Sequence, residues 1–161
     1  MIDRSKVLEF ATRKHTGQKR KDGKDYITHP IAVAEIALEL FELEEVINWK
    51  DEDPNVAESD LNELRDEIYI LSLLHDVYED TDTTLEEIEE LFGNRIRHGV
   101  NMLSNKDKVM TYFDFIMRLV NRPWDWTIRL VKRADLRHNM SDLSEGSMKD
   151  KYRFAEHLLK P

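Results

Sequence analysis

Cysteine is absent from this chain of 161 residues, which excludes disulfide bonds, a thiolate zinc site and a cysteine nucleophile. Glycine and proline are scarce as well, at five and four residues, and no P-loop or glycine-rich dinucleotide turn is present. No apolar run approaches the length of a membrane span, and the first residues do not have the character of a signal peptide. We therefore expect a cytoplasmic protein that does not enter a membrane.

Basic residues are fewer than acidic ones: the chain has 24 Lys and Arg residues and 33 Asp and Glu residues, for a net charge of −9. This excess argues against general nucleic-acid binding, but it leaves room for a small anionic ligand in a local basic pocket. Hydrophobic residues make up 40% of the chain, enough for one domain, spanning residues 1–161, to bury its own core. Nothing in the sequence indicates the oligomeric state.

Hydrophobic spacing predicts an all-α fold, with no alternating strands and no internal repeats. The predicted helices lie around residues 7–11, 30–40, 61–80, 85–92, 96–103, 113–120 and 127–140. Thr84 and Glu87 form a capping box at the start of one helix, and Gly93 closes it. Residues 48–60 are acidic and contain a proline, so we expect an exposed loop without a catalytic role.

One predicted helix carries a histidine where its apolar pattern calls for leucine. Its buried stripe runs through residues 61, 64, 68 and 71, and the next position is His75. Asp76 is adjacent, and Glu79 and Asp80 follow one turn later on the same helix end. Three carboxylates and a histidine cost desolvation energy unless a cation sits among them. The pattern therefore indicates a divalent metal; the alternative is a hydrogen-bonded core histidine beside a solvated acidic helix end.

Asp135 is another carboxylate on an apolar helix face, since Ile128 and Val131 precede it at spacings that keep all three on that face. A lone carboxylate there needs a cation or strong donors. Asn139 follows one turn later on the same face, whereas we expect His138 to point to another face and to lie outside the site. The alternative is a buried salt bridge between Asp135 and a neighbouring Arg or Lys side chain.

Residues 13–24 reverse the sign of the chain, with six Lys or Arg residues and a single acid. Pro30 then suits the first turn of a helix, which places His29 at the helix mouth with a ring nitrogen available. Considered separately, the basic segment could be a solvated loop and His29 a capping residue.

These segments together resemble the HD phosphohydrolases, and more narrowly the hydrolase domain of RelA/SpoT-type alarmone enzymes, including the small single-domain alarmone hydrolases. The likeness rests on His29 with Pro30 and on residues 75–81 and 134–140, and residues 17–23 and 92–93 match as well. It departs from the family in a longer segment between His29 and His75, in the order of residues 133–137 and in a poor match over residues 101–108.

The resemblance implies a single HD-type helical domain that binds one divalent metal, usually Mn²⁺. The implied metal ligands are His29, His75, Asp76 and Asp135. The implied water-handling carboxylates are Glu79 and Asp80, and the implied nucleotide contacts are Arg20, Lys21, Ser104 and Asn139. No synthetase domain follows in the sequence, so we expect no synthesis of the nucleotide.

The chemistry of this residue set is consistent with phosphoester hydrolysis. Two imidazoles and two carboxylates leave positions on an octahedral metal for water and a phosphate oxygen, and a neighbouring carboxylate can act as general base. The sequence predicts hydrolysis of the 3′-pyrophosphate of the guanine nucleotides ppGpp and pppGpp, giving GDP or GTP and pyrophosphate. The alternatives are another nucleotide substrate, such as NADPH or a nucleoside monophosphate, and a non-catalytic nucleotide-binding sensor or partner-binding module.

Overall fold

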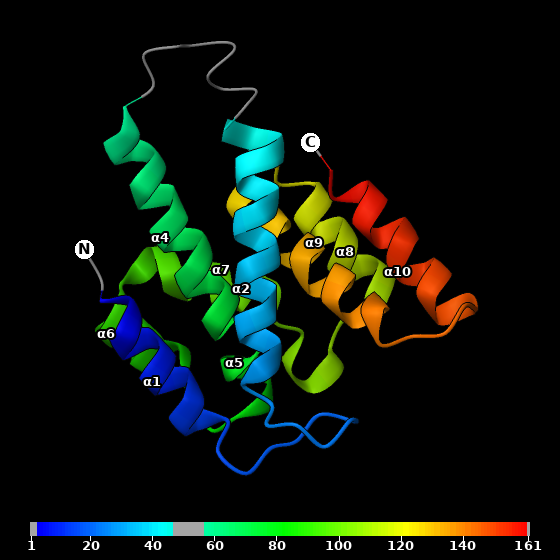
Figure 1. Ribbon diagram of the computed structural model, residues 1–161, viewed down its shortest axis with the longest axis horizontal. Helices are drawn as coiled ribbons and strands as arrows, with labels where there is room; N and C mark the ends of the chain where they lie inside the picture. Colours follow the sequence, from blue (N-terminus) through cyan, green and yellow to red (C-terminus); the bar gives the residue numbers. More distant parts are fainter. Residues whose placement is uncertain (1–2, 47–56, 161) are drawn as a thin grey trace.

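The computed structural model describes residues 3–46 and 57–160, which form helices and connecting loops (Figure 1). Within these residues there is no strand, and Lys19 and Asp25 form an isolated bridge. The all-α prediction is confirmed. The elements are α1 (Arg4–Lys14), α2 (Thr28–Leu40), its π-helical extension η1 (Phe41–Val46), α4 (Glu58–Leu74), α5 (Val77–Asp80), α6 (Leu85–Phe92), α7 (Asn94–Leu103), the 3₁₀ turn η2 (Lys106–Lys108), α8 (Tyr112–Val120), α9 (Trp126–Ser141) and α10 (Ser147–Leu158). None of the described helices is long and apolar enough to cross a membrane.

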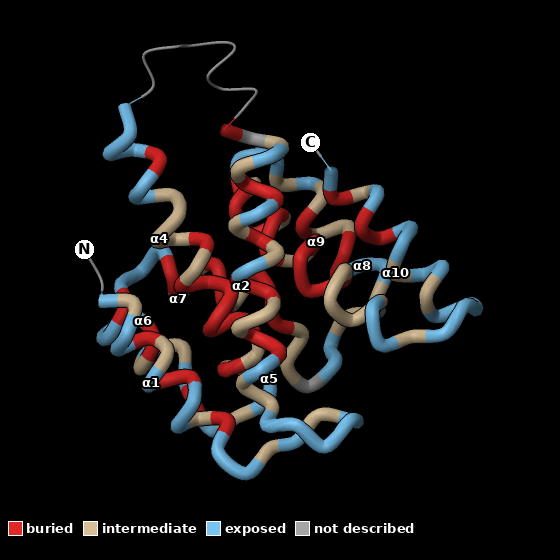
Figure 2. Tube along the Cα trace, in the orientation of Figure 1, coloured by how far each residue is buried: buried red, intermediate tan, exposed pale blue. Residues whose placement is uncertain are grey.

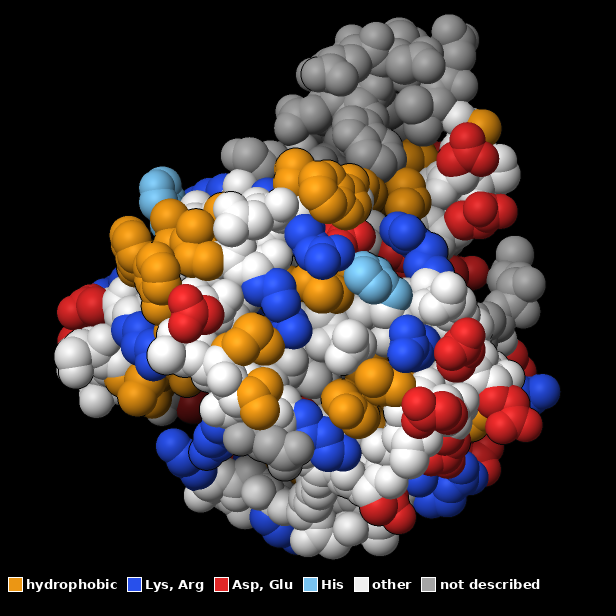
Figure 3. Space-filling model, turned by 180° about the vertical axis from the view of Figure 1, so that it is seen from behind, with side chains coloured by type: hydrophobic (Ala, Val, Ile, Leu, Met, Phe, Trp, Pro, Cys, Tyr) orange, Lys and Arg blue, Asp and Glu red, His pale blue; other side chains and the backbone are white. Residues whose placement is uncertain are grey.

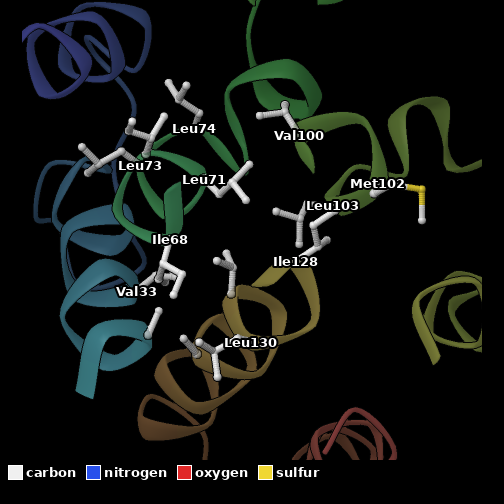
Figure 4. Close-up of a cluster of buried hydrophobic side chains, with 14 of the residues drawn as sticks. Val33, Ile68, Leu71, Leu73, Leu74, Val100, Met102, Leu103, Ile128 and Leu130 are labelled. Atoms are coloured by element: carbon white, nitrogen blue, oxygen red, sulfur yellow. The ribbon is translucent and has the colours of Figure 1, made fainter. Parts of the chain in front are cut away.

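Three helices, α2, α4 and α9, pack against one another in pairs and form the centre of the fold. Their facing sides are buried along most of their length (Figure 2). Val33 of α2, Ile68 and Leu71 of α4, and Leu130 of α9 belong to this core (Figure 4). Because each such side chain stabilises the fold by about 1.5–3 kcal/mol when buried, the three helices are firmly placed relative to one another.

The predicted stripe of the central helix is confirmed, but the helix is not continuous. Leu61, Ile68 and Leu71 are buried, Leu64 is partly buried against the core, and α4 ends at Leu74. The Ser72 carbonyl, which a continuing helix would pair with the Asp76 N–H, accepts a hydrogen bond from His75 Nδ1 at 2.7 Å. A new helix of four residues, α5, then begins at Val77. The break turns the His75 and Asp76 side chains toward the same point.

Helix α6 begins and ends as the sequence predicts. The Thr84 side chain accepts a hydrogen bond from the Glu87 N–H, and Gly93 closes the helix with a φ of +86°, which glycine adopts without strain. Helix α7 then packs against α4 at Gly99, where an added Cβ would lie 2.4 Å from Leu71 Cδ2. Figure 3 shows the molecule from behind. Acidic side chains gather there along the edge of the molecule that α4, α6 and α1 form in Figure 1.

Helix α10 was not predicted from the sequence, and it packs along α9. Ala155 of α10 and Leu159, which follows it, are buried. Glu156 of α10 accepts hydrogen bonds from Arg133 and Arg137 of α9, so a buried ion-pair network joins the two helices. The acidic loop expected at residues 48–60 lies largely outside the described residues, and Glu58–Asp60 form the first turn of α4.

Candidate metal centre and nucleotide pocket

Side chains from three separate stretches of the sequence form a ring at the junction of α2, α4 and α9. We call His29, His75, Asp76 and Asp135 the His–Asp ring. His29 Nε2 lies 3.1 Å from Asp135 Oδ1 and 3.5 Å from Asp76 Oδ2. His75 Nε2 lies 3.0 Å from Asp76 Oδ2 and 3.7 Å from Asp135 Oδ1. Atoms at such spacings can share one cation, because neighbouring ligands of an octahedral ion with bonds of about 2.1–2.3 Å lie roughly 3 Å apart.

The surroundings of His75 determine which of its ring nitrogens carries a proton. Nδ1 is 2.7 Å from the Ser72 carbonyl, which only accepts, so Nδ1 is the donor. Nε2 is buried and has no hydrogen-bond partner among the described residues, although Asp76 Oδ2 is close. A buried nitrogen lone pair beside two carboxylates fits a metal ion, and the backbone bond at Nδ1 is the usual arrangement for a metal-binding histidine.

The charges of the ring point to the same conclusion. Burial lowers the pKa of His75, but Asp76 and Asp135 outweigh burial and raise this pKa to about 10. Burial raises the pKa values of the two carboxyl groups, yet the histidines, and Lys132 for Asp135, hold these values well below the usual range. The space between the carboxylates therefore favours positive charge, and a divalent cation supplies more of it than a proton does.

Asp135 makes contacts on both of its oxygens. Lys132 Nζ lies 2.7 Å from Oδ2, so the salt bridge considered as the alternative is present. It leaves Oδ1 facing His29 and His75, and Asn139 Nδ2 donates to this oxygen at 2.7 Å. The salt bridge thus fixes the orientation of the carboxylate, and Asn139 lies on the face that the spacing predicted.

The prediction that His138 points away from the site was wrong. Its Nδ1 atom lies 2.8 Å from His29 Nδ1, and the two rings are 4.8 Å apart. The error came from treating residue 138 as belonging to another face, although a residue three positions after Asp135 is its neighbour on a helix. That spacing was the signal in the sequence that could have placed His138 at the site.

Glu79 and Asp80 lie on the wall of a cavity of about 410 Å³ beside the His–Asp ring. Glu79 Oε2 accepts a hydrogen bond of 2.7 Å from the Asn105 backbone N–H. Asp80 Oδ2 lies 3.3 Å from the Tyr26 hydroxyl. Burial, followed by the charges of Asp76 and Glu79, raises the pKa of Asp80. Two carboxylates beside a candidate cation site can bind a water molecule and accept its proton.

A second cavity, of about 320 Å³, adjoins the first at Tyr26 and Asn139, which line both. Arg20 and Lys21 lie on its wall, where Arg20 forms an ion pair of 2.5 Å with Asp142. The remaining lining residues are Lys19, Leu143, Met148 and Tyr152. Arg20, Lys21 and Asn139 are thus brought to one groove that opens onto the His–Asp ring.

Ser104 is the exception among the residues expected to contact a nucleotide. It is buried, does not line either cavity, and its hydroxyl donates to the Val100 carbonyl at 2.8 Å. Serine hydroxyls near helix ends commonly form this local bond. The structure places the neighbouring Asn105 and Lys108 at the cavity wall instead.

Two further residues lie at the site that the sequence analysis did not select by number, although Lys132 is one of the basic neighbours considered there as partners of Asp135. The Tyr26 hydroxyl lies 2.6 Å from Asp76 Oδ2, and Lys132 lines the first cavity beside Asp135. Tyr26 sits in a loop without helical periodicity, and Lys132 is one of several basic residues on α9. Tertiary packing brings Tyr26 to the cavity, whereas Lys132 lies beside Asp135 because it precedes that residue by three positions on α9.

The site has a histidine and an aspartate at the end of a core helix, with further ligands from two other helices and a cavity lined by carboxylates. Such a site is typical of helical, metal-dependent phosphohydrolases. The HD domain family matches residues 26–145, which include the whole His–Asp ring. The chain belongs to this family.

The proteins similar in sequence include one not much longer than this chain and two that are several times longer. The human protein named guanosine-3′,5′-bis(diphosphate) 3′-pyrophosphohydrolase MESH1 is 31% identical over 141 residues, which cover 86% of this chain and 68% of the relative. The protein from Escherichia coli (strain K12) named bifunctional (p)ppGpp synthase/hydrolase SpoT is 32% identical over 155 residues, covering 90% of this chain and 18% of the relative. A GTP pyrophosphokinase of Myxococcus xanthus is 30% identical over 164 residues, covering 96% and 19%. This chain spans about a fifth of the length of the two long relatives.

One solved structure has a similar fold. It is that of a protein described as a metazoan ortholog of SpoT, and it matches with a TM-score of 0.62 at 22% identity. The match covers 97% of this chain and 82% of that chain. The helical arrangement around the His–Asp ring is therefore shared with a solved structure.

Proposed function

We propose that this chain hydrolyses the 3′-pyrophosphate of ppGpp and pppGpp, giving GDP or GTP and pyrophosphate. The observation that carries the proposal is the His–Asp ring with Glu79 and Asp80 beside it on one cavity wall. The names of the human and Escherichia coli relatives support this substrate.

The His–Asp ring would bind one divalent cation, which we propose to be Mn²⁺. When bound, the cation polarises a phosphate oxygen and lowers the pKa of its bound water. His75 is prepared for this role because Ser72 fixes its tautomer. Asp135 is prepared because Lys132 and Asn139 fix its orientation.

Asp80 is the proposed general base. It removes a proton from the attacking water, and its raised pKa brings the carboxylate closer to the pH at which proton transfer is efficient. Glu79 Oε2 accepts a hydrogen bond from the Asn105 N–H, and the proposed role of its other oxygen is to orient the same water. The water attacks the phosphorus atom bonded to the 3′ oxygen, and that P–O bond breaks. The leaving 3′ oxygen takes the proton that Asp80 removed from the water, so the nucleotide retains a 3′-hydroxyl and the other product is pyrophosphate.

The two adjoining cavities suit a nucleotide with two pyrophosphate groups. The 3′-pyrophosphate would lie in the first cavity, with Lys108 and Lys132 on its wall. The guanosine and its 5′-diphosphate would extend into the second cavity, past Asn139 to Arg20 and Lys21. A guanidinium group can stack on a purine, and a lysine can pair with phosphate.

The test is a product assay with purified protein, Mn²⁺ and ppGpp. We expect GDP and pyrophosphate in equal amounts, and no turnover after removal of divalent metal with a chelator. NADPH and a deoxynucleoside monophosphate are the competing substrates. Faster release of single phosphate from either one would contradict the proposed substrate, and nucleotide binding without any turnover would support a sensor.

A further inference from the structure

The loop between α1 and α2, residues 15–27, contacts α5 and the preceding residue Asp76 through two side chains. Gln18 Nε2 donates to the Asp80 backbone carbonyl at 2.8 Å. The Tyr26 hydroxyl lies 2.6 Å from Asp76 Oδ2 and 3.3 Å from Asp80 Oδ2. In Figure 1 this loop runs below α2 and beside α5. The loop therefore reaches both the backbone and the carboxylate of Asp80.

The two contacting side chains are themselves fixed within the loop. His15 is buried, and its Nδ1 lies 2.8 Å from Gln18 Oε1. Because the Gln18 amide nitrogen is the donor to Asp80, its oxygen accepts, and His15 Nδ1 carries the proton. The His15 ring also packs against the Tyr26 ring at 4.8 Å. Gln18 and Tyr26 are thus held in place before any ligand binds.

Asp80 needs such external contacts. It is the last residue of α5, which has only four residues, and a single helical turn is not stable by its own hydrogen bonds. The cavity wall encloses part of the Asp80 carboxylate, but the residue as a whole is exposed, so packing does not fix it either. Glu79, by comparison, has the Asn105 backbone bond.

The same loop carries the cations proposed to contact the nucleotide. Backbone bonds from Arg20 N to the Lys24 carbonyl (2.9 Å) and from Tyr26 N to the Gln18 carbonyl (3.0 Å) join its two limbs. Arg20 and Lys21 are at its tip, and Gln18 and Tyr26 are at its base. A displacement of the loop would therefore move the nucleotide contacts and Asp80 together.

We propose that Gln18 and Tyr26 are positioning residues that set the Asp80 carboxylate against the His–Asp ring. This inference rests on the proposed role of Asp80 as general base. Neither side chain takes part in proton transfer. They affect the reaction only by positioning Asp80. The same loop would therefore both bind the nucleotide and hold the general base in place.

Tyr26→Phe tests the hydroxyl while keeping the ring that packs on His15. We expect kcat on ppGpp to fall about 10- to 100-fold, as for a reacting group displaced by about 1 Å. KM should change less than about twofold. The Mn²⁺ affinity of the nucleotide-free protein, measured by calorimetry, should fall by less than tenfold, because Asp76 loses the Tyr26 hydroxyl but keeps its contacts with His29 and His75. Gln18→Leu should act in the same way through the backbone. Tyr69→Phe removes a hydroxyl from α4, where the ring lies under Arg4, and should change none of these values.

The double variant with Asp80→Asn separates a positioning role from a general loss of structure. If Tyr26 acts through Asp80, then Tyr26→Phe lowers kcat no further in the Asp80→Asn background. Equal losses in both backgrounds would overturn the inference. A tenfold or greater loss of Mn²⁺ affinity in Tyr26→Phe would also overturn it, because Tyr26 would then act on Asp76 and the metal.

Amide hydrogen exchange tests the same contacts and does not depend on enzymatic turnover. The Asp80 N–H donates to the Asp76 carbonyl at 2.8 Å, and this amide should exchange faster in Tyr26→Phe and Gln18→Leu than in wild type or Tyr69→Phe. Unchanged exchange would overturn the inference even if the protein cleaved a different nucleotide. Wild-type protein that did not cleave ppGpp, but showed the exchange difference, would contradict the proposed function and support the positioning contacts.

Discussion

His138 lies against His29 with their two Nδ1 atoms 2.8 Å apart, and this contact links the last turns of α9 to the first turn of α2. The other ring nitrogen of His29 faces Asp76 and Asp135. For His29 Nε2 to offer a lone pair to a cation, Nδ1 must carry the proton and His138 must accept it. Burial is the main cause that lowers the pKa of His138, and the charge of Arg20 lowers it further; both favour the neutral ring, which can accept.

His138→Ala should weaken Mn²⁺ binding to the nucleotide-free protein by about 10- to 100-fold, the usual cost of losing such an orienting partner. His138→Gln, which keeps an acceptor, should recover part of the loss. Calorimetric titration of the metal measures both variants. Equal affinities for wild type and His138→Ala would show that His29 does not depend on this contact.

Asp135→Ala should abolish metal binding and destabilise the fold. The variant removes an oxygen of the His–Asp ring and leaves Lys132 without its carboxylate partner. We expect the free energy of unfolding to fall by about 3 kcal/mol, measured by urea denaturation of metal-free protein. Asp150→Asn, an exposed change on α10, is the control and should leave metal binding unchanged. Intact metal binding in Asp135→Ala would end the proposed ligand set.

Asp80→Asn should retain the metal and lose turnover. The His–Asp ring is untouched, while removal of a general base lowers kcat by about 10²–10⁴-fold. Comparison of kcat on ppGpp with the Mn²⁺ dissociation constant tests this division of roles. A loss of metal affinity as large as that of Asp135→Ala would mean that Asp80 is a ligand and not the base.

Arg20→Ala should weaken the use of ppGpp mainly through KM, by roughly 1–2 kcal/mol, as expected for a stacked cation. Lys24→Ala is the matched control, since Lys24 belongs to the same loop, is exposed and does not line the second cavity. Initial rates over a range of ppGpp concentrations give KM for both. Similar KM values for wild type and Arg20→Ala would remove the main local support for a guanine nucleotide substrate.

Glu156→Gln should lower stability in a pH-dependent manner. Burial raises the pKa of Glu156, but Arg137 and Arg133 outweigh burial and lower it below its ordinary value of 4.5. A depressed pKa adds stability above the unfolded-state value, and this contribution disappears as the pH falls through the folded-state value. At pH 7 we expect a loss of about 1–3 kcal/mol, which shrinks below about pH 4.5. Urea denaturation at pH 7 and at pH 4 measures the difference; a pH-independent loss would contradict the assignment.

Helical periodicity alone was enough to find the helices that bury a regular stripe and the residues that interrupt it. Ile68 and Leu71 lie in the core as their spacing predicts, and His75 is buried at the next position of that stripe. The same reasoning placed Asp135 and Asn139 on one face, where they form a hydrogen bond. These features are local, because a helix repeats its faces every three to four residues whatever packs against them.

How these helices meet could not be inferred from periodicity and follows from the packing of the whole chain. The break after Leu74 coincides with the hydrogen bond from the His75 ring to the Ser72 carbonyl, which hydrophobic periodicity cannot predict. The Ser104 hydroxyl donates to a carbonyl of its own helix instead of facing the cavity. Helix α10 depends on its contacts with α9, which include the ion pairs of Glu156.

The His–Asp ring shows the limit most clearly. Spacing within a helix indicates which side chains share a face, but it does not indicate which faces meet. His29 and His138 are 109 residues apart in sequence, and Tyr26 and Asp76 are 50 apart. Their contacts exist because the burial of apolar side chains fixes α2, α4 and α9 against one another, and this packing energy is shared among residues distributed over the whole chain.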